Sequence, residues 1–167
     1  HTFTSHSDTE VLLHAWAEWG KGALSRLNGI FAFLLWDART GSLLAVRDRL
    51  GVKPLHYLQQ SHMIAFASEI KGLLALPGIF AEANEPCVFD FLASGRLDHT
   101  NETMFRGISR LPAGSLLEVE RSGGVQVSRY WSLPAETGVE SCDLSQVAKR
   151  FGELFRDSVR LQMRADV

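Results

Sequence analysis

The chain has 167 residues, of which 46% are apolar and 22% are charged, and its formal net charge is −2. This length fits one domain, or one domain with part of a second, and allows an ordinary hydrophobic core. The near balance of charge argues against a nucleic-acid surface, which requires a basic patch, and no apolar run is long enough to span a membrane.

The first part of the chain predicts a helix followed by a β-hairpin. Ser7 and Glu10 have the spacing of a capping box, with Ser7 as the N-cap and Glu10 at the third helical position. Apolar residues at helical spacing extend this helix to about Trp19. Two apolar runs at 30–36 and 42–47, joined by a polar turn, predict an antiparallel pair of strands.

The middle of the chain predicts further hairpins and two further helices. The run 30–36 is apolar on both faces, which predicts a strand that is covered on each side. Short turns favour antiparallel pairing, and the mixture of helices with such strands predicts the α+β class. Ser68 is the expected N-cap of the helix predicted at 69–76. The expected strands span 55–60, 63–67, 116–120 and 125–130, and the expected helices span 69–76 and 86–93.

The pattern is lost at residues 134–142, where proline, glycine and small polar residues predict a linker. Ser145 is the expected cap of a final helix. An apolar stripe runs along one face of this helix, and no later segment of the sequence is available to cover it. The stripe consists of Leu144, Val147, Phe151, Leu154 and Phe155.

The histidines and cysteines are scattered. The sequence contains no glycine-rich phosphate loop, His-x-x-x-His pair or Gly-x-Ser-x-Gly motif. His14 and His56 are interpreted as packed or surface side chains rather than ligands, so no metal site is predicted. Cys87 begins a predicted helix, where the dipole lowers a thiol pKa, but a nucleophile needs a base and none adjoins it in the sequence. Cys142 lies in the predicted linker, and the cysteine spacing predicts a reduced, cytoplasmic setting.

Charged residues gather at a turn after the strand predicted at 42–47. Arg47, Asp48 and Arg49 precede Gly51 and Pro54. Charges placed this close to buried strands are costly unless they are paired. We therefore predict that these three side chains pair with one another and brace the turn, because most charge clusters are structural.

The start of the first helix has two interpretations. Its free backbone N–H groups and a carboxylate lie in one place. In the first interpretation Asp8 belongs to the cap and has no other role. In the second, Asp8 binds the ammonium group of a substrate through a charge-assisted hydrogen bond.

Five blocks, in order over residues 3–131, resemble the glutaminase domain of the asparagine synthetase family, the class II glutamine amidotransferases. The third block matches the family pattern Arg-Asp-x-Leu-Gly-x-x-Pro-Leu. Each block alone is a weak signal, but their order and spacing make the set specific. The blocks are Phe3–Val11, Asn28–Phe33, Arg47–Leu55, Phe66–Lys71 and Phe105–Gly114.

The resemblance implies a four-layer α/β/β/α sandwich of the N-terminal-nucleophile hydrolase type. In this family an N-terminal cysteine attacks the side-chain amide of glutamine, its α-amino group serves as base, and an oxyanion hole stabilises the intermediate. The released ammonia amidates aspartate, which ATP with Mg²⁺ activates in a synthetase domain. Asp8 is the one residue that the resemblance carries over, as the contact to the α-amino group of glutamine.

The sequence departs from the family at its start. It opens with His1, and neither the nucleophilic cysteine nor the arginine and oxyanion residues of the pocket precede Asp8. The resemblance therefore implies a fragment that lacks the first strands: amidotransferase residues 1–133, a linker at 134–142, and the first helix of a synthetase domain at 143–167. We expect no catalytic residue, no cofactor and no glutamine hydrolysis in this fragment. Exposed sheet edges would favour a homodimer.

Two other functions fit the same residues. Beta-lactam synthetases resemble asparagine synthetases but lack the nucleophilic cysteine, so the domain could be a scaffold for an ATP-dependent amide ligase. It could also be a non-catalytic module that binds a small ligand or a protein, because a fold does not fix a function. The residues that precede His1 in the gene would discriminate between the first two functions.

Overall fold

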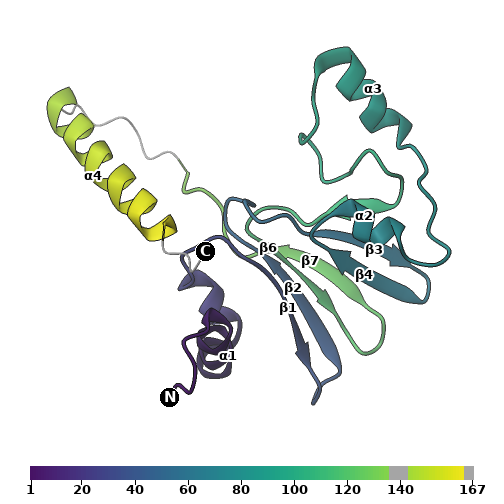
Figure 1. The fold of residues 1–167 in the computed structure, drawn as a ribbon, viewed down its shortest axis with the longest axis horizontal. Coiled ribbons are helices and arrows are strands. Elements are labelled where there is room, and N and C mark those ends of the chain that lie inside the picture. The colour runs from purple at the N-terminus through teal and green to yellow at the C-terminus, as the bar shows by residue number, and fades with distance from the viewer. Residues whose placement is uncertain (136–142, 164–167) are drawn as a thin grey trace. The chain divides into compact units, whose positions relative to one another are not determined.

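The computed structural model describes residues 1–135 and 143–163. They belong to two compact units, one formed by residues 1–30 with the described residues from Leu133 onward, the other by Phe31–Ser132. The second unit contains the β-sheets (Figure 1). Residues 136–142, which make up most of the predicted linker, and residues 164–167 lie outside the described part.

Seven strands form two antiparallel sheets in the second unit. They are β1 (Ala32–Asp37), β2 (Ser42–Arg47), β3 (His56–Gln60), β4 (Met63–Ala67), β5 (Ile108–Arg110), β6 (Ser115–Val119) and β7 (Val125–Arg129). The strand orders are β1-β2-β6-β7 and β4-β3-β5. The predicted antiparallel hairpins and the α+β class are confirmed, whereas β5 was missed because three residues cannot show an alternating pattern.

The β1–β2 hairpin shows why these sequences turn where they do. Asp37 pairs with Ser42 at the end of the ladder. The Oδ1 atom of Asp37 accepts hydrogen bonds from the backbone N–H groups of Arg39, at 2.9 Å, and Thr40, at 3.3 Å. A short acidic side chain that accepts from backbone two and three residues ahead is a favoured way to fix a turn.

The core lies between the two sheets. Ala45 of β2 and Leu117 of β6 are fully buried and face Tyr57, Ile64 and Phe66 of the second sheet. Side chains alternate along a strand, so these residues share the inner faces while their neighbours point away. This is the packing of two sheets face to face.

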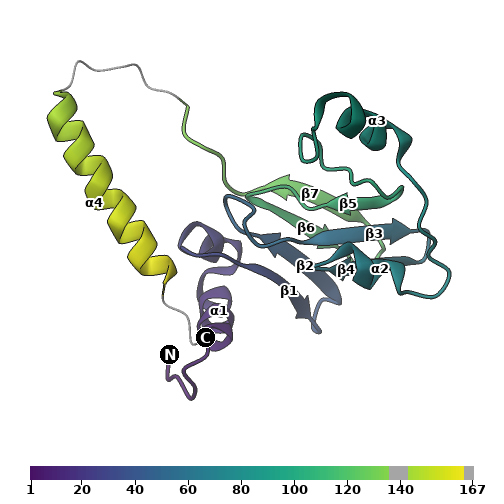
Figure 2. The same cartoon turned by 45° about the horizontal axis from the view of Figure 1, so that its top comes forward.

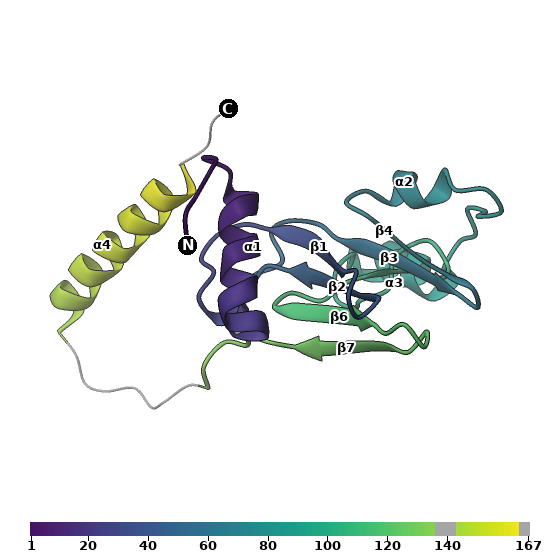
Figure 3. The same cartoon turned by 90° about the horizontal axis from the view of Figure 1, so that it is seen from below.

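The outer face of the second sheet packs against a helix. Leu58 of β3 and Ile108 of β5 form a cluster with Leu73 of α2 (Ile70–Leu74). Figure 3 shows α2 lying over β3 and β4. Each of these three side chains is at least 95% buried, and truncating such a side chain to Ala typically costs about 2–5 kcal/mol. The layers of this unit are therefore α2, the three-stranded sheet and the four-stranded sheet.

The apolar sequence of β1 predicted a strand that is covered on both faces. This prediction is wrong for part of the strand. Leu34 and Trp36 are 48% and 62% exposed. β1 lies at the edge of its sheet and pairs only with β2 among the described strands, so its side chains have strand neighbours on one side only.

The first unit begins with α1 (Asp8–Trp19), as predicted. Gly20 ends the helix with a φ of 53°, a positive value that glycine adopts without strain. A 3₁₀ helix, η1 (Gly20–Ser25), follows. The guanidinium of Arg26 lies 4.4 Å from the centre of the Trp19 ring and covers the end of α1.

The chain leaves the sheets after α2 to form α3 (Glu85–Ser94) and then returns as β5 (Figure 2). Gly95 ends α3 with a φ of 70°, as its position predicted. The amide of Asn84 fixes the base of this excursion by donating to Glu102 at 2.8 Å and to the carbonyl of Thr103 at 3.0 Å.

The final helix is α4 (Leu144–Gln162), and its predicted apolar stripe is exposed, Phe151 by 67% for example. Its cap is Asp143 rather than Ser145, because the Asp143 carboxylate accepts the N–H of Ser145 at 2.9 Å. The predicted cap of α2 is also wrong, since Glu69 rather than Ser68 occupies that position, and its side chain makes no capping bond. None of the helices in the described parts of the chain combines the length and apolar character that crossing a bilayer requires.

Candidate glutamine-binding site

The N-terminus of α1 presents an exposed carboxylate. Ser7 is the N-cap, as predicted, and its hydroxyl accepts the N–H of Thr9 at 3.2 Å. Asp8 is the first helical residue and is exposed. Among the described residues, its carboxylate has only a long 3.5 Å contact from the Thr9 hydroxyl. The capping bond is therefore made by Ser7 and not by the Asp8 side chain, whose charge is favourably placed at the positive end of the helix.

Glu10 does not close the predicted capping box. Its carboxylate instead accepts hydrogen bonds from Thr4 and Ser5, two from each residue, at 2.5–2.9 Å. Hydrogen bonds lower the pKa of Glu10 to about 2, and the largest contribution comes from the Ser5 hydroxyl, followed by the Thr4 N–H. Sequence spacing alone could not show this, because the partners are set by the loop before the cap rather than by the helix.

Aromatic rings hold the first residues of the chain against α1. His14 stacks on His1, with 4.6 Å between ring centres, and meets the edge of Phe3 at 5.0 Å. His1 also lies 3.2 Å from the carboxylate of Glu18. His14 is thus a packed side chain, as predicted. Within residues 1–135 and 143–163 no three His, Cys, Asp or Glu side chains gather closely enough to hold a metal ion.

The charged turn after β2 is held by bonds to the backbone. The buried Arg47 guanidinium donates to the carbonyl groups of Gly51, Lys53 and Leu111, at 2.5, 2.8 and 2.7 Å. Burial lowers the pKa of Arg47 from its usual value. Because Leu111 is 64 residues away in sequence, this side chain joins the turn to the segment that precedes β6.

Asp48 binds the backbone N–H groups of the same turn, whereas Arg47 binds its carbonyl groups. It is 1% exposed, and its carboxylate accepts the N–H groups of Leu50, Val52 and Lys53 at 3.2, 3.0 and 2.8 Å. For Arg47 and Asp48 the predicted hydrogen-bond partners are therefore wrong, because both side chains bond to backbone groups rather than to each other. A buried turn contains many backbone donors and acceptors that need bonds, and the first two side chains provide them.

Two later segments close around this turn. The Gly114 N–H donates to the Asp48 carbonyl at 2.8 Å, and Gly114 has a φ of 61°. A Cβ atom there would lie 2.6 Å from the carbonyl oxygen of Trp131. The Tyr130 hydroxyl donates to the Arg47 carbonyl at 2.8 Å, and burial raises the pKa of Tyr130 to about 12. Sequence analysis missed Tyr130, because nothing local indicates a bond that spans 83 residues.

A polar cavity of about 270 Å³ lies beside the turn. Arg110 forms an ion pair with Asp98 at 2.7 Å on its wall. Its lining has no thiol or imidazole. The cavity is lined by Arg47, Leu50, Gly51, Asp98, Thr100, Asn101, Arg110, Pro112 and Ala113.

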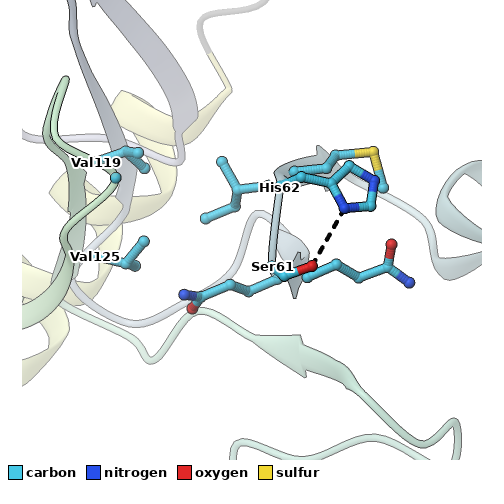
Figure 4. A pocket seen from close by; sticks show the side chains of 9 residues that line it. Ser61, His62, Val119 and Val125 are labelled. Atoms are coloured by element: carbon cyan, nitrogen blue, oxygen red, sulfur yellow. Dashed lines mark hydrogen bonds between the residues drawn. The ribbon is translucent and has the colours of Figure 1, made fainter.

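A second cavity of about 230 Å³ lies between the β3–β4 and β6–β7 hairpin tips (Figure 4). Ser61 and His62 lie on one wall, and the Ser61 hydroxyl is 3.3 Å from Nδ1 of His62. Val119 and Val125 form the apolar side. Both polar residues are exposed, and no third group orients the imidazole in the described chain, so the pair lacks the arrangement of a catalytic dyad.

The other candidates have structural surroundings. Cys87 lies in the first turn of α3, and its thiol donates to the carboxylate of Glu102 at 3.9 Å. Cys142 lies outside the described residues. His56 is packed on β3 with Nδ1 3.1 Å from the Ser68 carbonyl, and burial lowers the pKa of His56.

The family follows from comparison with known proteins. A sequence profile described as a glutamine amidotransferase domain matches residues 1–131. The chain therefore belongs to the glutamine amidotransferase domain family, as its motifs predicted. This range contains the helix that carries Asp8 and both β-sheets.

The similar curated proteins are much longer than this chain. Asparagine synthetase [glutamine-hydrolyzing] 3 of Bacillus subtilis (strain 168) is 37% identical over 167 residues, which are 100% of this chain and 27% of that protein. Asparagine synthetase [glutamine-hydrolyzing] 2 of the same strain is 32% identical over 176 residues, covering 100% of this chain and 24% of that protein. The chain thus spans about a quarter of the length of these relatives.

A solved structure shares the fold. The allosteric regulatory enzyme of purine biosynthesis superposes with a TM-score of 0.50 at 22% identity, over 80% of this chain and 24% of that one. At this identity the likeness concerns the fold alone, and it agrees with the predicted α+β architecture.

Proposed function

We propose that this chain is part of the domain that takes nitrogen from glutamine in a larger amide-forming enzyme of the glutamine-hydrolysing asparagine synthetase type. The observation that carries this proposal is the match of the whole chain, at 37% identity, to a protein with that name. In this proposal glutamine and aspartate are the substrates, ATP with Mg²⁺ acts in a separate synthetase domain, and the enzyme works in the cytoplasm. A homodimer remains a prediction.

Asp8 is the residue proposed to bind glutamine. Its carboxylate is exposed at the start of α1, and Ser7 already caps the helix. An ammonium group can therefore approach Asp8 without displacing a structural bond. A charge-assisted hydrogen bond of this kind is roughly twice as strong as a neutral one and would select the α-amino group of an amino acid.

The proposal also divides the chain. The family profile ends at residue 131, whereas the similarity to the asparagine synthetase continues through all 167 residues. The exposed apolar stripe of α4 suits a helix that packs within a further domain. We therefore assign residues 1–133 to the amidotransferase domain, 134–142 to a linker and 143–167 to the beginning of a synthetase domain.

The test uses the full-length product of the gene, with glutamine or ammonium as nitrogen source. Asp8→Asn should raise the KM for glutamine by at least tenfold, the effect of losing one charge-assisted hydrogen bond, and should leave the KM for ammonium unchanged. Glu18→Gln, on the same helix, is the matched control. Equal losses with both sources would make Asp8 structural, and amide formation without glutamine hydrolysis would favour the scaffold function.

A further inference from the structure

The carboxylate of Glu10 is fully engaged although it lies near the surface. Oε1 accepts the N–H and hydroxyl of Thr4 at 2.8 and 2.9 Å, and Oε2 accepts the N–H and hydroxyl of Ser5 at 2.7 and 2.5 Å. Four donors in two consecutive residues fix both the backbone and the side chains of the loop that leads into α1. Only a carboxylate offers enough lone pairs for such a set.

These bonds continue beyond Glu10 toward Asp8. The Ser5 hydroxyl, which donates to Glu10, also accepts the N–H of Ser7 at 3.2 Å. The Ser7 hydroxyl in turn accepts the N–H of Thr9 at 3.2 Å. The relay Glu10–Ser5–Ser7–Thr9 therefore ends on the two residues that flank Asp8. Thr4 is bound to the same carboxylate, but within the described chain its hydrogen bonds do not lead on to Ser7.

We propose that Glu10 is a positioning residue for glutamine binding, acting through Ser5 and Ser7 to hold the Asp8 carboxylate in place. This inference rests on the proposed contact between Asp8 and glutamine. A ligand contact made by one exposed side chain depends on the backbone that carries it, since a misplacement of 1 Å is enough to weaken an oriented interaction. The relay fixes the backbone on both sides of Asp8 and leaves its carboxylate unoccupied.

The hydroxyl groups of Ser5 and Thr4 provide a matched pair of variants. Ser5→Ala and Thr4→Val each remove one hydroxyl bond to Glu10, but only the first breaks the relay. In the full-length gene product, Ser5→Ala should raise the KM for glutamine about tenfold and Thr4→Val about twofold or less, as expected for the loss of a charge-assisted hydrogen bond that does or does not reach the site. Ser5→Thr, which restores a hydroxyl, should recover most of the loss.

Glu10→Gln tests the head of the relay. Its single carbonyl oxygen cannot accept four bonds, so the KM for glutamine should rise at least as much as in Ser5→Ala, while the KM for ammonium stays unchanged. Amide hydrogen exchange of Thr4 and Ser5 in the 167-residue chain should become faster in the same variant. Glu18→Gln controls for removing a negative charge from α1.

The outcomes separate this inference from the proposed function. If Asp8→Asn raises the KM for glutamine but Glu10→Gln and Ser5→Ala do not, the relay has no positioning role. Equal effects of Ser5→Ala and Thr4→Val, or parallel losses with ammonium, would also reduce Glu10 to a structural residue. If Asp8→Asn itself leaves the KM for glutamine unchanged, the proposed function fails first.

Discussion

Residues 4–10 and residues 47–53 both have charged side chains next to a turn. The two regions differ in which of the charged atoms already make hydrogen bonds within the chain. In the turn after β2, the side chains of Arg47 and Asp48 are buried and bonded to backbone groups. At the start of α1, Glu10 is occupied in the same manner, whereas Asp8 carries only a 3.5 Å contact from its neighbour.

The difference separates scaffold from candidate site. Charges whose hydrogen-bonding capacity is used up by the backbone stabilise one conformation and have little left for a ligand. A charge held on a fixed backbone with its oxygens exposed is available for recognition. Both regions place charged residues within a few positions of one another, so the distinction comes from the partners of each atom.

The largest effect is expected from removing the Asp48 carboxylate from the turn after β2. In Asp48→Ala, three backbone N–H groups lose their acceptor. The free energy of unfolding should fall by about 4 kcal/mol, because each buried donor left unbonded costs about 1–3 kcal/mol. Urea unfolding measures this loss in the 167-residue chain, and Asp48→Asn, which keeps one acceptor oxygen, covers the case in which the alanine variant does not fold.

Asp37 provides the control for that experiment. Its carboxylate also accepts two backbone N–H groups in a turn, but it is partly exposed, so water can replace it. Asp37→Ala should therefore destabilise the chain much less. Similar losses in the two variants would mean that burial of the Asp48 turn is not what makes it a scaffold.

Most of the regular structure could be predicted because its signals are local. The helix at residues 8–19 has a cap, an apolar face and a terminal glycine within one stretch of sequence, and the hairpins have alternating runs around polar turns. β5 was missed because it is three residues long, and the caps at Glu69 and Asp143 because neighbouring polar residues compete for the same position.

The site could be predicted less well because its determinants are not local. The motif blocks, two of which contain Asp8 and the turn, predicted the correct family. No pattern, however, shows that Arg47 reaches Leu111 or that Tyr130 reaches Arg47. The same holds for the exposed edge of β1, since strand order is decided by pairing between distant segments.

A smaller effect is expected where a single bond crosses the turn. Tyr130→Phe removes the hydroxyl that donates to the Arg47 carbonyl, so the free energy of unfolding should fall by about 1 kcal/mol. Tyr57→Phe is the matched control, because the Tyr57 hydroxyl has no hydrogen bond in the described chain. Equal losses would show that the Tyr130 bond does not stabilise the turn.

Alkaline titration tests the same bond independently. The folded pKa of Tyr130 is raised from 10.0 to about 12, so its contribution to stability is present below pH 10 and is lost as the pH rises through 12. Ultraviolet absorbance should show one late-ionising tyrosine, which disappears in Tyr130→Phe. If Tyr130→Phe instead removes a transition near pH 10 from the folded chain, the hydroxyl of Tyr130 is not buried as described.

The smallest effect is expected at the surface, from the acid titration of Glu10. Its folded pKa is lowered from 4.5 to about 2. The stability it contributes is therefore present above pH 4.5 and is lost as the pH falls toward 2. The difference in unfolding free energy between the parent chain and Glu10→Gln should shrink over this window. His14 lies 3.7 Å from the same carboxylate, so both chains should carry His14→Gln, which leaves Glu10 as the changing charge at this contact.

The control for this titration is Glu18→Gln in the same background. Glu18 lies on the same helix, and its contact with His1 is exposed, so this variant shows the effect of removing a carboxylate that accepts no backbone N–H group in the described chain. A Glu10 difference that does not shrink over the same window would mean that the carboxylate does not hold Thr4 and Ser5 in solution. The Glu10 carboxylate would then hold no more hydrogen bonds than that of Asp8. The contrast between an acid that is bonded within the chain and one that can bind a ligand would be lost.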